Sequence, residues 1–106
     1  MKFYYNGKLI RTSKTRHYKY AIGTSDTGTY AVCSETWENA VKALVALKRR
    51  IVEAAESNYK FDQDPKNQEF LKKYYGDKYD QYDARAAYER AIARVQLAEI
   101  VELEER

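Results

Sequence analysis

The first third of the chain consists of short β-forming runs separated by turn residues. Asn6-Gly7 stands between two such runs, residues 3–5 and 8–11, and both residues of an Asn-Gly pair accept the positive φ of a tight hairpin turn. A glycine-containing polar stretch then separates two further runs, and the three segments are 17–22, 23–28 and 29–33. We therefore predict an N-terminal antiparallel β-sheet of three to four strands over residues 1–33.

The apolar positions then change to a helical period. Ser34 can cap a helix, and Glu35 and Glu38 stand where the positive end of the helix dipole favours acidic groups. At 100° per residue, one stripe collects Trp37, Ala40, Val41, Leu44, Leu47, Ile51, Val52 and Ala55. This pattern predicts a long helix over residues 34–58, with Trp37 packed against the sheet.

Two more helices are expected after it. Asp64-Pro65 is typical of a helix start and Gly76 of a helix end, which predicts a short helix over 64–75. An alanine-rich run predicts a long C-terminal helix over 78–105, beginning at about Lys78 or Asp80. Its apolar residues lie on two sides, so a homodimer through the C-terminal helix is one expected partner arrangement. The fold class is therefore α+β, with one sheet, two long helices and one short helix.

Composition bounds the class of protein. A chain of 106 residues with 44% apolar and 33% charged residues suits a single ordered domain, 1–106. The opening residues contain no apolar signal core, and no stretch approaches about 18 uninterrupted apolar residues. A single cysteine, Cys33, fits a reducing compartment. We expect a cytoplasmic protein that has no membrane partner.

Charge is distributed unevenly along the chain. Residues 1–34 hold six basic side chains and one acidic one, whereas the remaining residues hold thirteen basic and fifteen acidic ones. The chain is therefore expected to be positive at its start. Such a start favours partners that carry negative charge.

Catalytic and metal-binding patterns are weak in this sequence. Cys33 and His17 form the only cysteine–histidine combination, and both fall in predicted strands without a recognisable third orienting group. One cysteine and one histidine cannot supply a usual structural zinc site, and the carboxylate runs lack the spacing of a calcium loop. No glycine-rich phosphate-binding loop is present. We expect no enzyme activity, no cofactor and no metal.

The segment 11–20 carries the strongest functional signal, because cations alternate with hydroxyls and aromatics along it. The candidate partner-binding residues are Arg11, Lys14, Arg16, Tyr18 and Lys19. Such a surface can contact phosphates and stack bases, or it can bind a protein, because tyrosine and arginine dominate interface hot spots. The plain alternative is an ordinary sheet with scattered lysines on its wet side.

Tyrosine is unusually frequent, with eleven in the chain. Five of them surround the predicted corner at Gly76, and they are Tyr74, Tyr75, Tyr79, Tyr82 and Tyr88. A phenol suits half-buried surfaces, so this cluster is either a second contact patch or a small core under the corner.

Two short resemblances add expectations. The opening Lys2–Ser13 (KFYYNGKLIRTS) resembles the start of small accessory proteins of phages and integrative elements of Gram-positive bacteria, some of them anti-CRISPR proteins. These families share no motif, so the resemblance assigns no functional residue. It implies a mobile-element context and inhibition by binding.

The second resemblance covers residues 8–47, a sheet followed by TWENAVKAL at 36–44. This order is similar to the three-stranded-sheet DNA-binding domains of phage integrases and plant ethylene-response factors, which lay the sheet in the major groove. It implies DNA contact through the sheet.

Together these observations lead to two functional hypotheses. The first is a non-enzymatic interaction protein of phage or mobile-element type that binds a host protein, such as a Cas nuclease, and inhibits it. The alternative is a small DNA- or RNA-binding module that uses the basic, tyrosine-rich hairpin.

Overall fold

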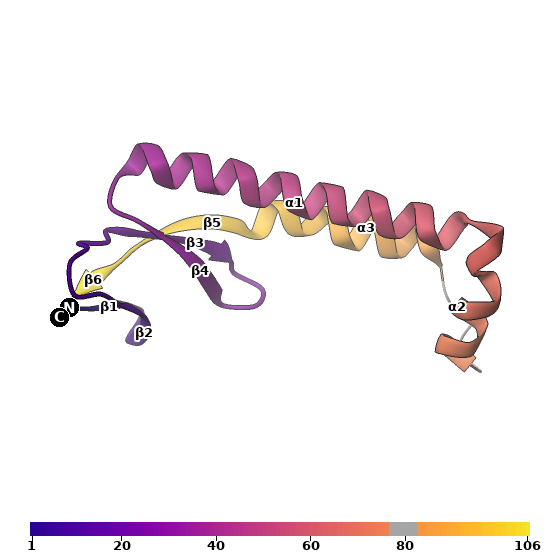
Figure 1. Ribbon diagram of the computed structural model, residues 1–106, viewed down its shortest axis with the longest axis horizontal. Coiled ribbons are helices and arrows are strands. Elements are labelled where there is room, and N and C mark those ends of the chain that lie inside the picture. Colours follow the sequence, from indigo (N-terminus) through magenta and orange to yellow (C-terminus); the bar gives the residue numbers. More distant parts are fainter. Residues whose placement is uncertain (77–82) are drawn as a thin grey trace. The chain divides into compact units, whose positions relative to one another are not determined.

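A computed structural model describes residues 1–76 and 83–106 and has the expected α+β architecture (Figure 1). Its contacts divide the chain into two compact units, where the sequence predicts one domain. Unit 1 comprises Met1–Arg49 and Gln96–Arg106, and unit 2 comprises Arg50–Val95. The boundary falls inside the long helix α1, Trp37–Gln63.

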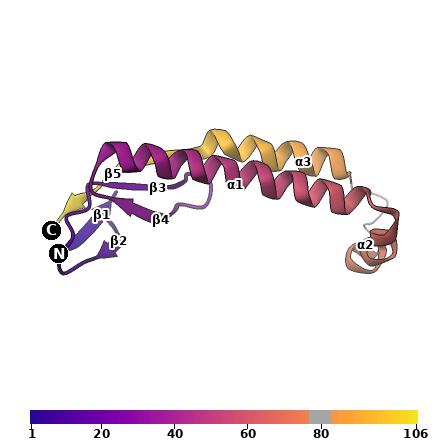
Figure 2. The ribbon, with the colours of Figure 1, turned by 45° about the horizontal axis from the view of Figure 1, so that its top comes forward.

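Unit 1 contains two antiparallel sheets of three strands each instead of one sheet. The first has the order β2-β1-β6 and is formed by Lys8–Thr12, Lys2–Tyr5 and Glu104–Glu105. The second has the order β4-β3-β5 and is formed by Thr29–Ser34, Tyr20–Thr24 and Ala98–Glu102. In both sheets the last strand comes from the end of the chain, which runs back beside the N-terminal strands (Figure 2).

The first hairpin forms where the sequence predicts it. Asn6 and Gly7 adopt φ values of 50° and 78°, so both central residues of the turn are left-handed, as this two-residue hairpin requires. The following strand β3 begins at Tyr20, three residues later than expected. Residues 13–19 connect the two sheets instead, which means that strands β2, β3 and β4 do not form one consecutive three-stranded sheet.

The predicted helix over 78–105 is wrong in its C-terminal part. Helix α3 spans only Ala84–Ala93, a 3-10 turn (η3) spans Arg94–Leu97, and the chain then becomes extended. Strand β5 pairs with β3 over five consecutive positions and buries Ala98 and Val101. Long-range pairing therefore overrides the helical propensity of this alanine- and glutamate-rich segment.

Two related expectations are affected. The predicted start at Lys78 or Asp80 lies outside the described residues. The predicted helix that was expected to carry a homodimer face is divided between two kinds of element, because Ala86 and Ala93 lie on α3 whereas Ile100, expected on the same side, lies on β5.

Helix α1 begins and ends later than predicted. Ser34 is the last residue of β4, and its hydroxyl donates to the carbonyl of Thr36 at 2.8 Å. Thr36 caps the helix instead, since its Oγ1 accepts from the backbone N–H of Asn39 at 3.2 Å. The last helical residue is Gln63, five positions beyond the predicted end.

The core of unit 1 is centred on β3. Ala21 and Ile22 are 0% and 2% exposed, and consecutive strand residues point to opposite faces, so β3 is covered on both sides. Neither face of β3 is therefore open to solvent at these two positions. In the adjacent sheet, Phe3 is fully buried and packs edge-on against Tyr18 at 5.5 Å between ring centroids.

The expected role of Trp37 is also wrong. Its side chain is 57% exposed and touches the sheet only edge-on, through Tyr20 at 5.4 Å between ring centroids. Within this first part of α1 it is the small residue Ala40 that is buried.

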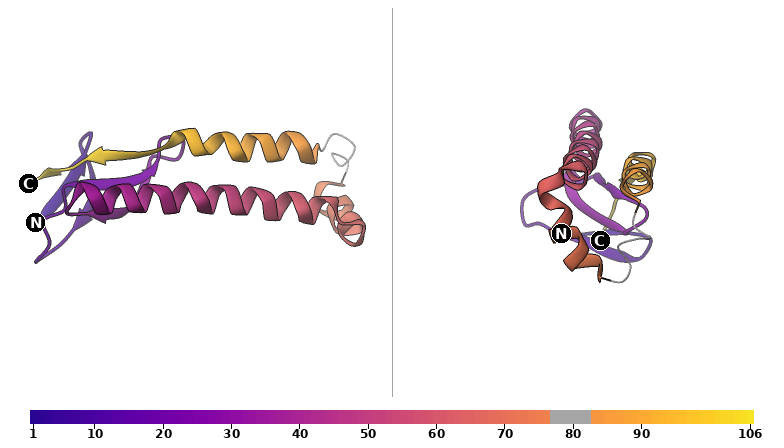
Figure 3. Two further views of the ribbon diagram at one scale, coloured as in Figure 1. Left: turned by 90° about the horizontal axis from the view of Figure 1, so that it is seen from above. Right: turned by 90° about the vertical axis from the view of Figure 1, so that its right-hand side faces the viewer.

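Unit 2 contains the second part of α1, the 3-10 turn η1 at Pro65–Asn67, α2 at Gln68–Tyr75, and α3. The short helix predicted over 64–75 is confirmed, with Asp64 Oδ1 accepting from the N–H of Lys66 at 2.9 Å and Gly76 at φ 55°. Figure 3 shows α3 alongside the second part of α1. Within the described residues, no helix is long and apolar enough to cross a membrane.

Candidate partner-binding surface

The connector, defined as residues 13–19, carries three of the predicted site residues, Lys14, Arg16 and Lys19, as exposed side chains. Its first turn is held by Ser13, whose Oγ accepts from the N–H of Arg16 at 3.0 Å and of Thr15 at 3.4 Å. The cations therefore project from a link between two sheets, and not from the face of a sheet as predicted.

Tyr18, the fourth predicted residue, is half-buried. Its ring meets Phe3 on one side, and the guanidinium carbon of Arg11 lies 5.6 Å from its centroid. This phenol ring anchors the connector to the β2-β1-β6 sheet through aromatic and cation–π contacts. Part of the ring remains available at the surface.

Arg11, the fifth predicted residue, already has partners inside the molecule. One guanidinium nitrogen donates to the carbonyl of Ala31 on β4 at 2.6 Å. Nearby, Lys8 Nζ donates to the carbonyl of Gly28 at 3.5 Å. Two cations of strand β2 thus cover the turn before β4 and the outer edge of its first half.

A shallow groove lies beside the remainder of that edge. Its volume is about 310 Å³. It is bounded by the end of β4, the turn into α1, the first residues of α1 and the connector, and its lining residues are Arg16, Tyr18, Val32, Cys33, Ser34, Glu35, Thr36, Asn39 and Ala43. The structure therefore brings Arg16 and Tyr18 together at one groove, while Lys14 and Lys19 remain elsewhere on the connector.

Hydrogen bonding on the other side of β3 fixes which backbone groups of β4 face this groove. The carbonyl of Lys19 accepts from Leu103, and the N–H of Ser25 donates to Leu97. Within β3, the odd-numbered Ala21 and Gly23 therefore bond toward β5, so the even-numbered Tyr20 and Ile22 bond toward β4. Lys19, which precedes the strand, does not follow this alternation, because its N–H donates to the Ser34 carbonyl on β4 at 2.9 Å.

The register carries this alternation over to β4. Tyr20 pairs with Ser34 and Ile22 with Val32, so Val32 and Ser34 direct their N–H and C=O groups inward. The N–H and C=O of Cys33 consequently face outward. The register shifts beyond Val32, and there the Ala31 carbonyl also faces outward, because Arg11 donates to it. Arg11 occupies the carbonyl of Ala31, whereas among the described strands none pairs with the outer side of β4 at Cys33.

Acidic strands moderate the positive charge of this region. Unit 1 holds ten basic and seven acidic side chains, a difference of three, because the glutamates of β5 and β6 return beside the N-terminal strands. Glu105 Oε1 lies 3.5 Å from His17 Nδ1, and Arg106 pairs with Glu104 at 3.1 Å. The strong positive excess of residues 1–34 is therefore partly neutralised in the folded unit.

Two side chains near the edge have shifted acidities. Burial raises the pKa of the Cys33 thiol, and the charge of Arg11 opposes this shift. A hydrogen bond from the Tyr30 hydroxyl to Glu99 at 2.7 Å, together with burial and the Glu99 charge, raises the pKa of Tyr30 to about 12. Cys33 is therefore mainly a neutral thiol, and no described contact joins it to His17.

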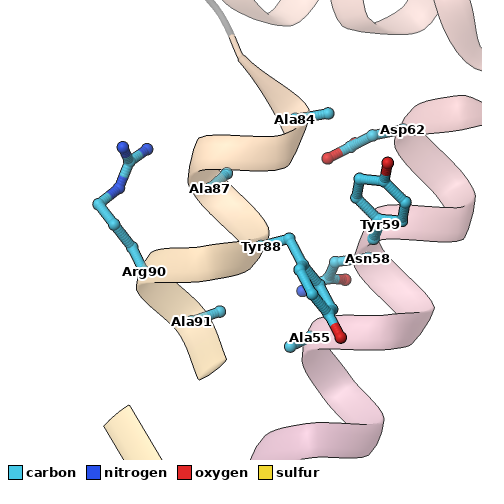
Figure 4. A pocket seen from close by; sticks show the side chains of 9 residues that line it. All are labelled: Ala55, Asn58, Tyr59, Asp62, Ala84, Ala87, Tyr88, Arg90 and Ala91. Atoms are coloured by element: carbon cyan, nitrogen blue, oxygen red, sulfur yellow. The ribbon is translucent and has the colours of Figure 1, made fainter. Parts of the chain in front are cut away.

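Unit 2 has a separate hollow of about 370 Å³ between α1 and α3 (Figure 4). Alanines from both helices line it, together with Asn58, Tyr59, Asp62, Tyr88 and Arg90. In Figure 4 the Asp62 side chain is directed toward α3, whereas the Arg90 side chain is directed away from α1. This lining contains no cysteine, serine, threonine or histidine that could act as a nucleophile or neutral base. Across residues 1–76 and 83–106, no group of three histidine, cysteine, aspartate or glutamate residues is arranged to hold a metal ion.

The predicted tyrosine cluster is divided between different aromatic pairs. Tyr74 is 73% exposed and stacks on Phe70 at 6.2 Å between centroids, whereas Tyr88 meets Tyr59 at 5.1 Å. Tyr79 and Tyr82 lie outside the described residues, as does the side chain of Tyr75. The described tyrosines therefore do not form one patch.

Sequence reasoning missed the open edge of β4 and the groove beside it. One signal was present, because Thr29–Ser34 contains no charged residue, although edge strands usually carry one. Which strand is an edge depends on β5, and that strand was predicted as helix. Comparisons with protein-family models, with curated proteins and with solved structures find no match for this chain.

Proposed function

We propose that this protein is a non-enzymatic interaction protein that binds another protein through the surface formed by the connector and the β4 groove. The observation that carries this proposal is the convergence of Arg16 and Tyr18 on one groove, with Lys14 and Lys19 exposed on the same connector. Arginine and tyrosine are the residues most often responsible for binding energy in protein interfaces. The neighbouring cations favour a partner with acidic groups.

The partner to test first is a bacterial defence protein such as a Cas nuclease, which follows from the resemblance of residues 2–13 to phage accessory proteins. Inhibition would then result from occupying a surface that the nuclease needs. This choice of partner rests on the resemblance alone.

The alternative is a DNA- or RNA-binding module that uses the same cations. Its support is the cluster of lysine, arginine and tyrosine itself. The glutamates of β5 and β6 make this alternative less favourable, because they reduce the net charge of unit 1 to an excess of three basic groups. Nucleic-acid affinity depends on the neutralisation of phosphates by such groups.

A capture experiment tests the proposal. The tagged protein is incubated with lysate from bacteria that express Cas proteins, beside a Lys14→Glu/Lys19→Glu variant. A Lys66→Glu/Lys73→Glu variant serves as the control, because it makes the same charge change on exposed residues of unit 2. We expect a specific protein that is retained by the wild type and the control and lost from the connector variant. Equal retention by all three proteins would contradict the proposed surface.

A gel-shift series separates the two functions. Binding of labelled DNA or RNA that weakens by about 10³-fold or more between 50 and 200 mM salt would indicate a phosphate-dominated site. We expect no such binding. A steep, connector-dependent shift would favour the nucleic-acid alternative instead.

A further inference from the structure

The open end of strand β4 is suited to pairing with another strand. Cys33 directs both its N–H and its C=O outward, because it pairs with Ala21, whose own groups bond toward β5. Antiparallel addition of one extended segment would therefore form two hydrogen bonds at Cys33. Extended peptides are bound in this way by many domains that have an exposed sheet edge next to a groove.

The residues that line the groove define how such a segment would be held. Asn39 and Ala43 are contributed by α1, and Arg16 and Tyr18 by the connector. Val32 is 41% exposed beside the same edge and supplies an apolar contact. Main-chain pairing would provide affinity, and these side chains would provide selectivity.

The charged side chains near β4 determine which kind of peptide segment binds best. The strand itself is uncharged, but cations border it, because Lys8 and Arg11 lie along its first half and Arg16 lies at the groove. Glu35 is the only acidic side chain among the groove-lining residues, and it already accepts from the N–H of His17 at 3.0 Å. An acidic peptide is therefore attracted and a basic one is repelled.

A second copy of this chain fits the edge poorly. In an antiparallel pair of two β4 strands centred on Cys33, the two Arg16 side chains, which line the groove at that residue, would come close to each other. Like charges brought together at an interface cost binding energy. The edge thus favours a different molecule over self-association.

We infer that the open edge of β4, together with the adjoining groove, docks an extended acidic segment of the partner protein by strand addition at Cys33. This inference rests on the proposed function and specifies how the partner would be recognised. It requires a segment of at least three extended residues, with a carboxylate placed to reach Arg16.

Selection from a phage-displayed library of randomised twelve-residue linear peptides tests the inference on the full chain. We expect the selected peptides to be enriched in aspartate, glutamate and β-branched residues. Their affinity should fall at least tenfold for Cys33→Pro, which among the backbone hydrogen-bonding groups removes only the outward N–H, and for Arg16→Glu. Cys33→Val keeps this N–H and should lose less affinity than Cys33→Pro. Lys66→Glu, at an exposed residue of unit 2, is the control and should bind within about twofold of the wild type. Circular dichroism and urea unfolding establish that each variant is folded.

Chemical modification of the selected peptide provides a second readout. A strand has two edges, so N-methylation of alternate amides on one edge should abolish binding, and N-methylation on the other edge should leave it intact. Bound peptide should also slow alkylation of Cys33, the single thiol of the chain. Binding that tolerates both methylation patterns would show that no strand is added.

Several results would overturn the inference while leaving the proposed function in place. These are an empty selection, peptides without acidic enrichment, or unchanged affinity for Cys33→Pro, each combined with connector-dependent capture of a protein from lysate. A dimer in sedimentation that Cys33→Pro abolishes would instead identify a second copy as the occupant, and would also overturn it. Loss of protein capture by wild type and control alike is the separate failure that removes the proposed function.

Discussion

The two edges of the β4-β3-β5 sheet are protected in different ways. Strand β5 carries its own charges, Glu99 and Glu102, whereas β4 has none. The cations that cover β4 come from a strand of the other sheet and reach only as far as Ala31. Charged side chains on an edge strand discourage unwanted pairing. Side chains from another strand therefore cover the edge of β4 only in part, and the uncovered part of this edge lies at the candidate binding surface.

The largest expected effect on the free energy of unfolding comes from proline substitutions in β4, which differ for backbone N–H groups that face inward and outward. Val32→Pro removes an N–H that bonds to β3 and should cost about 3 kcal/mol or more. Cys33→Pro removes an outward N–H and should cost about 1 kcal/mol or less, since edge positions tolerate proline. Urea unfolding measures both free energies. Equal losses for the two variants would mean that the alternation along β4 is assigned incorrectly.

Gly23 tests how β4 is held against the central strand. A Cβ added there would lie 1.9 Å from the carbonyl oxygen of Thr29, so Gly23→Ala must displace the backbone of β4 and should cost about 2–3 kcal/mol. Gly28→Ala is the control, because nothing lies within 4 Å of its added Cβ. Its left-handed φ of 64° should cost only about 1 kcal/mol. Thermal unfolding of the two variants checks this order, and a larger loss for Gly28→Ala would contradict it.

The hydrogen bond from Tyr30 to Glu99 connects the uncharged strand to the charged one, and its effect depends on pH. The folded pKa of Tyr30 is raised to about 12 from the ordinary value of 10. The resulting stabilisation is fully present below pH 10 and is lost as the pH rises through about 12, because the unfolded chain releases this proton first. Wild type should exceed Tyr30→Phe by about 1 kcal/mol at pH 7.

The pH dependence of that difference is the decisive readout. Urea unfolding of both proteins at several pH values should show the advantage of the wild type shrinking between pH 10 and 12. The other ten tyrosines are common to both proteins and cancel in the comparison. A difference that stays constant over this range would show that the hydroxyl does not bond to Glu99.

The smallest expected effect concerns Arg11. Arg11→Gln should lower stability by less than about 1 kcal/mol, because the contact with the Ala31 carbonyl is exposed. It should nevertheless increase self-association at high protein concentration, since it uncovers another outward carbonyl of β4. Light scattering beside the control Arg49→Gln, an exposed residue of α1, measures this effect. Equal light scattering by Arg11→Gln and the control would mean that Arg11 does not prevent pairing at the edge of β4.

Features that depend on local sequence were predicted correctly, whereas features that depend on long-range strand pairing were not. Asn6-Gly7 and Asp64-Pro65 specify a turn and a helix start through their own backbone preferences, and both features are present. Residues 98–102 have a helix-like composition, and only their pairing with β3, more than seventy positions away, makes them a strand. The face of α1 that meets the sheet was likewise not specified locally, so Trp37 was misplaced.

The same division applies to the candidate site. Arg16 and Tyr18 were identified from residue type, and they do line the groove. Arg11 was identified by the same reasoning, but its guanidinium is used inside the molecule. The outward direction of the Cys33 backbone N–H and C=O could not be predicted, because it depends on the register of three strands and on which strand lies at the edge of the sheet.

Amide hydrogen exchange in the free protein, followed residue by residue by NMR, tests the open edge most directly. The amides of Val32 and Ser34 should exchange slowly, because they bond to β3, and the amide of Cys33 between them should exchange at least tenfold faster. Slow exchange at all three positions would mean that the edge is already covered, and would contradict a docking site at Cys33.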